Sequence, residues 1–202
     1  MTWKDIKKAT LQRLFVIEGG TVVISHTTEP YLNAMPAAAN EGIFLLASVG
    51  GTGTKSVTFN KTRHTGSYQA FNMNDLVKDF SSFTDEIYIE TSNGRKRVFE
   101  YLTESSSVLL LPSSLQGEVT VYYNPVPALV TELTPDDEEL QLLPMASNLL
   151  PLYMASQLFK DDDMQQAVQL RNEFEAGLSR LSRMVISSRK KKEKMENITG
   201  WR

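Results

Sequence analysis

The hydrophobic positions of the first 54 residues recur at helical spacing in two stretches. Thr2 followed by Asp5 is typical of a capping box, and the apolar positions after it continue to Gly19-Gly20, where we expect a first helix to end. Pro36 lies early in the second pattern, so it should kink that helix or restart it. The apolar positions of this second pattern are Leu32, Met35, Ala39, Ile43 and Leu46.

Between 55 and 130 the pattern changes to short alternating runs separated by turn formers, which is typical of strands. Asn93-Gly94 lies between two such runs and predicts a tight hairpin. The apolar run 109–111 predicts a buried strand that ends at its proline, and Gln116-Gly117 predicts a turn into the next strand. The prolines of 124–127 cannot continue a central strand, so the chain should leave the sheet there.

Helical periodicity returns over 131–188. Thr134-Pro135 with the acids that follow predicts a helix start, and two further prolines inside the pattern predict either two pieces or one bent helix. The acidic run 161–163 should cap a fourth helix. One face of this helix carries Ala167, Leu170, Phe174, Leu178, Leu181 and Val185. The pattern stops at Ser187-Ser188, so we expect the last helix to end there.

These patterns together predict an α+β fold. Residues 1–54 and 131–188 should form a discontinuous four-helix antiparallel bundle, because the last two helices are joined by a short connection. The β-rich insertion at 55–130 should form a small antiparallel sheet or sandwich. Residues 189–202 should form an extended basic C-terminal arm, since six basic and two acidic residues leave too little apolar surface to fold alone.

The composition of the chain limits the kinds of partner that we expect for it. The 202 residues carry 21 basic and 24 acidic side chains, so a net charge of -3 gives no whole-chain attraction to nucleic acid or to an anionic membrane. The chain has no cysteine and therefore no disulfide or thiolate site, which fits synthesis in a reducing compartment. No stretch approaches the roughly 20 apolar residues of a membrane span, so we expect no membrane partner.

A search for catalytic chemistry gives weak candidates. The glycines of 50–56 precede Lys55-Ser56, but a phosphate-binding loop needs glycine directly before the lysine, and Thr54 stands there, so a flexible hinge is the better interpretation. His26 and His64 fall in different predicted units and lack helically spaced acidic or histidine partners. We therefore predict no enzyme, no cofactor and no metal site.

The insertion is rich in aromatic residues that alternation would place partly outward. They could line a sugar- or peptide-binding face, which makes a carbohydrate-binding or adhesion module the alternative function, although strand aromatics more often serve sheet packing. These aromatic residues are Tyr68, Phe71, Tyr88, Phe99, Tyr101, Tyr122 and Tyr123.

The C-terminal arm allows three interpretations: a solvated end, an arm for nucleic acid, or an arm that docks on a protein. Trp201 favours docking, because an indole at the end of a charged spacer is a poor solvated terminus and a good hydrophobic anchor.

Several local strings resemble the adaptor, or head-to-tail connector, proteins of tailed bacteriophages. They comprise Tyr31-Leu32-Asn33-Ala34-Met35-Pro36 with Ala39-Asn40-Glu41, Val119-Thr120-Val121-Tyr122-Tyr123-Asn124-Pro125, Leu149-Leu150-Pro151-Leu152-Tyr153-Met154-Ala155-Ser156, and Leu170-Arg171-Asn172-Glu173-Phe174-Glu175. The likeness covers the helical parts and the exit from the sheet.

This resemblance implies a structural virion protein that is made in the host bacterial cytoplasm and sits in the neck, between capsid and tail. It implies a twelve-fold ring of copies that docks on the portal, meets a tail or stopper protein below, and lets double-stranded DNA pass without sequence-specific binding. For the insertion, the alternatives then include a jelly-roll-like form. Docking on the portal falls by position to the C-terminal arm, through Arg189, Lys190, Lys191, Lys192, Lys194, Ile198, Trp201 and Arg202.

Overall fold

The computed structural model describes residues 1–14, 28–92 and 94–196, with side chains described up to Ser187. The chain is mixed α+β and divides into two compact units. The helical unit comprises Met1–Thr52 and Pro127–Arg202, and the β unit comprises Gly53–Val126. The boundaries expected from the sequence for the insertion were 55 and 130.

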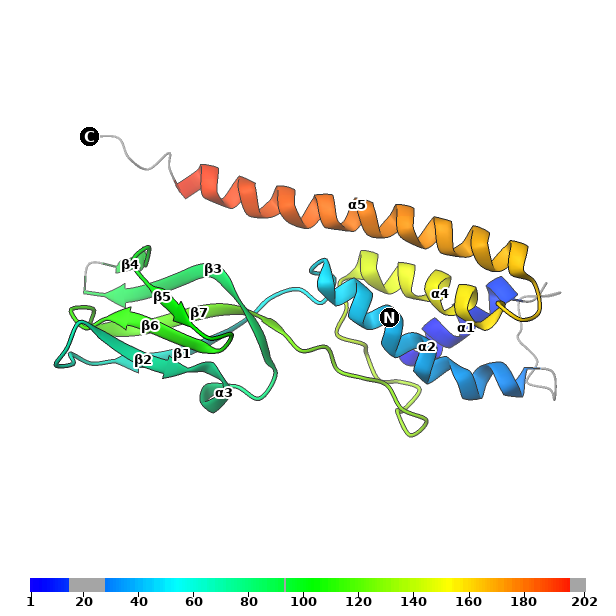
Figure 1. The fold of residues 1–202 in the computed structure, drawn as a ribbon, viewed down its shortest axis with the longest axis horizontal. Coiled ribbons are helices and arrows are strands. Elements are labelled where there is room, and N and C mark those ends of the chain that lie inside the picture. Colours follow the sequence, from blue (N-terminus) through cyan, green and yellow to red (C-terminus); the bar gives the residue numbers. More distant parts are fainter. Residues whose placement is uncertain (15–27, 93, 197–202) are drawn as a thin grey trace. The chain divides into compact units, whose positions relative to one another are not determined.

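The helical unit is organised around one central helix. Its helices are α1 (Trp3–Leu14), α2 (Glu29–Ser48), α4 (Pro144–Leu158) and α5 (Met164–Glu196). Helix α4 contacts each of the other three (Figure 1). Its buried residues lie all around it. Leu150, Tyr153 and Met154 are among them. The apolar faces of this segment are therefore covered within the chain, and they leave no argument for a further neighbour.

Helices α2 and α4 approach closely at Gly42. A Cβ at Gly42 would lie 2.6 Å from Leu150 Cδ1 and 2.9 Å from Tyr153 Cδ1. Both side chains are buried and have no room to withdraw. Glycine is thus required here by packing. Pro36 lies inside α2 and Pro151 inside α4, so neither proline ends its helix, and the α4 segment is one helix rather than two pieces.

The predicted helix start at Thr134-Pro135 is wrong, because α4 begins at Pro144. The acids that suggested a first turn instead belong to a loop that pairs with the start of α1. Trp3 donates its N–H to the carbonyl of Glu138 at 2.8 Å, and an isolated bridge joins Thr2 to Glu139. This tertiary pairing overrides the local capping pattern.

The predicted start of α5 is confirmed, and its predicted end is wrong. Asp163 Oδ1 accepts the N–H of Gln166 at 3.0 Å, as a helix cap should. Helix α5 then continues to Glu196, so 189–196 is helical and not extended. Residues 178–199 contain neither glycine nor proline, and basic residues near a helix C-terminus are favoured by the dipole. Residues 197–202 and the expected end of the first helix at Gly19-Gly20 lie outside the described residues.

The β unit contains two antiparallel sheets. The first has the order β1-β7-β3-β4, and the second has the order β2-β6-β5. The elements are β1 (Lys55–Lys61), β2 (Tyr68–Asn72), the short helix α3 (Met73–Leu76), β3 (Phe80–Thr91), β4 (Gly94–Arg97), β5 (Leu102–Glu104), β6 (Val108–Pro112) and β7 (Gly117–Pro125).

Both sheets contribute to one hydrophobic core. Ile87, Val121 and Leu109, from β3, β7 and β6, belong to a single buried cluster, as the alternation along each strand requires. Two local predictions are confirmed: the hairpin between the two runs, in which Thr91 of β3 pairs with Gly94 of β4, and the buried strand over 109–111. Asn93 itself lies outside the described residues.

The chain leaves the sheet after Pro125, but Pro125 is the last residue of the inner strand β7 and lies opposite Phe80, so the prediction that no proline of 124–127 could continue a central strand is wrong. Proline is tolerated there because the pairing is irregular, with a register shift between Phe80 and Ser82.

Candidate interaction surfaces

Helix α5 is longer than the core on which it packs. Leu181 is buried, and Val185 Cγ1 lies 3.0 Å from the place of a Cβ on Gly50 at the end of α2. Val185 is the last residue with a described side chain that packs on the helical core. Residues 186–196 continue the helix for about 16 Å more at the α-helical rise.

The residues predicted to dock on a portal divide between two parts of the chain. Arg189, Lys190, Lys191, Lys192 and Lys194 lie on the backbone of α5. Ile198, Trp201 and Arg202 lie outside the described residues. Their docking role stays a prediction. Five of the eight lie on a helix and not in an extended segment.

A polar cluster joins the three helices that face one another in the helical unit. Tyr153 on α4 donates its hydroxyl to Glu41 Oε2 on α2 at 2.9 Å, and the Arg171 guanidinium on α5 lies 4.9 Å from the Tyr153 ring centroid. Arg171 also pairs with Glu175 at 2.7 Å. Burial, followed by the bond to Glu41, raises the pKa of Tyr153. The cluster therefore fixes α5 against α2 and α4.

The loop between β7 and α4 is held in place by Asn40. Its side-chain amide donates to the carbonyl of Val130 at 2.9 Å, and its oxygen accepts the N–H of Val130 at 2.8 Å. Further along, Thr131 N–H donates to Thr134 Oγ1 at 2.8 Å and closes a turn. Leu133 lies within this turn and is 91% exposed. An ordered loop thus presents a leucine to solvent.

The outer face of the four-stranded sheet carries a compact aromatic and charged group. Arg95 lies 4.4 Å above the Tyr88 ring and donates to the Tyr122 hydroxyl at 3.2 Å, which raises the pKa of Arg95. Tyr88 meets Tyr122 edge to face at 6.0 Å. Of the other aromatic residues predicted for a binding face, Tyr123 points into the core, where it donates to Asp79.

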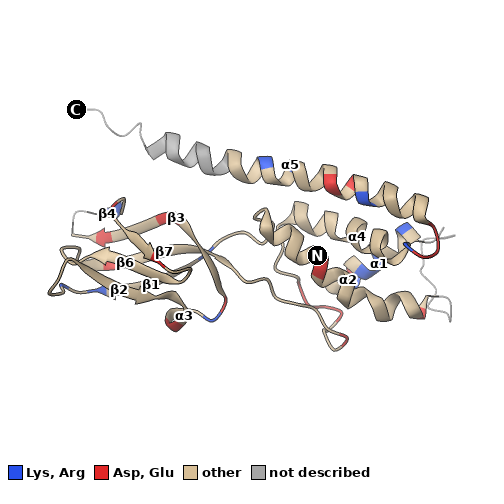
Figure 2. Cartoon of the chain, viewed as in Figure 1, with Lys and Arg blue, Asp and Glu red and all other residues tan. Residues whose placement is uncertain are grey.

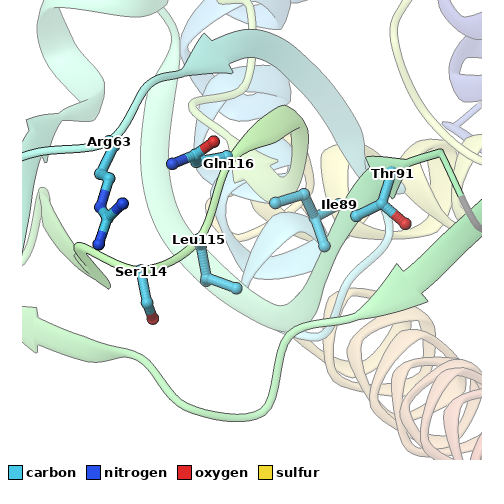
Figure 3. Close-up of a pocket in the computed structure, with 6 residues that line it drawn as sticks. All are labelled: Arg63, Ile89, Thr91, Ser114, Leu115 and Gln116. Atoms are coloured by element: carbon cyan, nitrogen blue, oxygen red, sulfur yellow. The ribbon is translucent and has the colours of Figure 1, made fainter.

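A shallow hollow of about 420 Å³ lies at one end of this sheet. Figure 3 shows Arg63, Ser114 and Gln116 beside the apolar side chains of Ile89 and Leu115. Thr91 completes the lining.

A buried lysine stands beside this hollow. Lys61 is 2% exposed and donates to the carbonyl of Leu115 at 3.0 Å; its burial lowers its pKa. The hollow therefore combines an apolar floor with donors and positive charge.

The glycine segment 50–56 serves the end of α2. Gly50 adopts φ +84°, which favours glycine, and the N–H of Gly51 donates to the carbonyl of Leu46 at 2.8 Å. The carbonyl of Gly51 accepts the N–H of Leu143 at 2.7 Å. Gly50 and Gly51 thus form a hydrogen-bonded helix cap, and the hinge interpretation of the segment stays a prediction.

The remaining candidates for chemistry are the histidine and acidic residues that could bind a metal ion. Within the described part of the chain, no three His, Asp or Glu residues gather in a way that could hold a metal ion. His26 lies outside that part, and His64 is exposed on the β unit. No helix among residues 1–14, 28–92 and 94–196 is long and apolar enough to cross a membrane.

Sequence reasoning missed Asn40, Leu133 and Lys61. Asn40 and Lys61 act through partners far away in the chain, and no local pattern marks such partners. Leu133 could have been noticed as a leucine within a polar, acidic stretch.

No model of a known protein family matches the chain, and a search of curated proteins finds no similar sequence. The fold defines a class, a mixed α+β protein with a helical unit and a unit of two antiparallel sheets.

Proposed function

We propose that the chain is a structural protein of a tailed-bacteriophage virion, an adaptor subunit that forms a ring in the neck and docks on the portal through residues 189–202. The observation that carries this proposal is the continuation of α5 past Val185 to Glu196. The last turns of this helix extend beyond the hydrophobic core and are rich in lysine, so they are available to bind another molecule.

The resemblance to connector proteins supports the proposal through the residues that build the helical unit. Tyr153 and Met154 of the third resembling string and Phe174 of the fourth are buried. The proposal includes the finer architecture, a four-helix antiparallel bundle interrupted by a β insertion, which takes a jelly-roll-like form. It needs no catalysis and no cofactor.

The ring has defined partners under this proposal. Copies of the chain surround the DNA channel in twelve-fold symmetry, the portal lies above, and a tail or stopper protein lies below. Double-stranded DNA passes without sequence-specific contact, which agrees with an acidic chain whose longest run of basic residues, 189–192, lies near one end.

Truncation tests the docking segment. A chain that ends at Ser188 should keep the thermal midpoint of the full chain and should no longer co-sediment with rings of the portal protein from the same phage. Trp201→Ala should weaken this binding about 30-fold, as loss of an aromatic anchor does. Lys78→Ala on the β unit is the control. Normal binding by the truncated chain would refute the docking role.

The hollow on the β unit favours a second candidate, a carbohydrate-binding or adhesion module. Its apolar floor and its donors, Arg63 and Gln116, are the groups that hold a sugar ring. The full chain on a glycan array should bind a ligand that Arg63→Ala loses. If the full chain bound no glycan on a broad array, this candidate function would be excluded.

A further inference from the structure

Three exposed apolar side chains of the helical unit, one on α2 and two on the β7–α4 loop, define a candidate apolar patch. Phe44 is 50% exposed, Leu129 52% and Leu133 91%. Phe44 is one helical turn from Asn40, and Asn40 holds Val130, the neighbour of Leu129. The patch is therefore built on an ordered surface.

The loop that carries Leu129 and Leu133 is acidic. Residues 127–143 contain five acidic residues and no basic residue. Figure 2 shows this loop with red segments and no blue. Asp136 pairs with Lys7 at 2.5 Å, whereas Glu132 and Asp137 are exposed. Exposed apolar side chains on an acidic loop fit a basic partner surface that has apolar positions of its own.

Helix α5 carries such a surface. Residues 176–188 contain two basic residues, Arg180 and Arg183, and no acidic residue. Arg180 and Arg183 are exposed, and the apolar side chains of Met184 and Ile186 are also exposed beside them. The two surfaces of one chain are therefore complementary in charge, and both contain exposed apolar side chains.

We infer that the occupant of the patch is a second copy of this chain, which places the Arg180–Ile186 face of its α5 on Phe44, Leu129 and Leu133. Because the two surfaces differ, the contact is heterologous: each copy uses its loop on one side and its α5 on the other. Repeated contacts of this kind close into a ring when the rotation between copies allows it. The inference rests on the proposed function in taking a ring as the final state.

Charge reversal tests the contact without a portal. By sedimentation velocity in 50 mM salt, the full chain should associate, and Glu132→Lys with Asp137→Lys should weaken association at least tenfold. Arg180→Glu with Arg183→Glu should do the same. A chain with all four changes should associate again. Glu100→Lys with Glu104→Lys on the β unit makes the same change in net charge and should have no effect.

Leu133→Ser tests the apolar part and should weaken association without loss of thermal stability, since the side chain is exposed. The inference is overturned if the full chain stays monomeric at 100 µM, if either reversal leaves association unchanged, or if the fourfold variant fails to recover. Portal binding by the Arg180/Arg183 variant separates the proposals, because that variant keeps residues 189–202. Its binding would uphold docking even where the contact between copies fails.

Discussion

At the scale of single residues, Asn40 shows how one amide can order a long loop. It satisfies both backbone groups of Val130, a residue whose side chain is buried in the helical core. When a buried N–H and carbonyl lose their hydrogen-bond partners, the free energy of their removal from water is no longer offset, and the folded state is destabilised. The order of the acidic loop, and with it the exposed position of Leu133, depends on this residue.

Asn40→Ala should therefore lower the free energy of unfolding by about 1–3 kcal/mol. Urea denaturation measures this loss. Asn33→Ala, at an exposed position of the same helix, should change stability by less than about 0.5 kcal/mol. Equal effects of the two substitutions would contradict the anchoring role of Asn40.

Tyr123 predicts a dependence of stability on alkaline pH. Burial, with the bond to Asp79, raises its pKa to about 12 from an ordinary value of 10.0. Below pH 10 the phenol is neutral in both the folded and the unfolded chain, so its contribution to stability is complete. Between pH 10 and 12 the unfolded chain ionises first, and stability falls.

The urea midpoint of the wild-type chain should thus drop between pH 10 and 12, and Tyr123→Phe should reduce that drop. Absorbance at 295 nm follows ionisation directly, and the difference between the two proteins should titrate near pH 12. A difference that titrates near pH 10 would contradict the buried position of this hydroxyl.

Residue roles were predictable from the sequence where they are local. The cap at Asp163 and the capping box of Thr2 with Asp5 use partners three residues away, and the structure contains both. Asn40 bonds to a residue 90 positions away, and Lys61 to one 54 positions away. A single sequence gives no sign of such pairs.

At the scale of elements, the periodic faces of the helices were predictable and two boundaries were not. Thr134-Pro135 has the composition of a helix start, but Thr134 closes a turn with Thr131, and the carbonyl of Glu138 accepts from α1. The end of α5 was missed for a different reason. The apolar pattern stops near Ser188, whereas the helix propensity of the lysines and glutamates does not.

Ser188→Pro tests the extension of α5. Proline removes a backbone donor and clashes with the preceding turn, so far-ultraviolet circular dichroism should lose roughly eight residues of helix. The thermal midpoint should stay unchanged, because Val185 is the last described side chain on the core. Ser188→Ala should keep the helical signal. An unchanged signal in Ser188→Pro would show that residues beyond 188 are not helical in solution.

At the scale of the whole molecule, the order helix, helix, β-rich segment, helix, helix was predictable, because the hydrophobic period changes twice along the chain. The two-sheet arrangement was only partly predictable, since pairing such as β1 with β7 joins distant residues. Fold alone does not define function. The functional proposal depends on surfaces, above all the long basic end of α5.

The most direct test of that proposal is electron microscopy of the full chain mixed with rings of the portal protein from the same phage. We expect a ring of copies coaxial with the portal, in twelve-fold symmetry, with density for α5 and residues 197–202 running onto the portal surface. Portal rings that remain bare at saturating chain, or that bind it without its C-terminal segment at the contact, would contradict the proposed function.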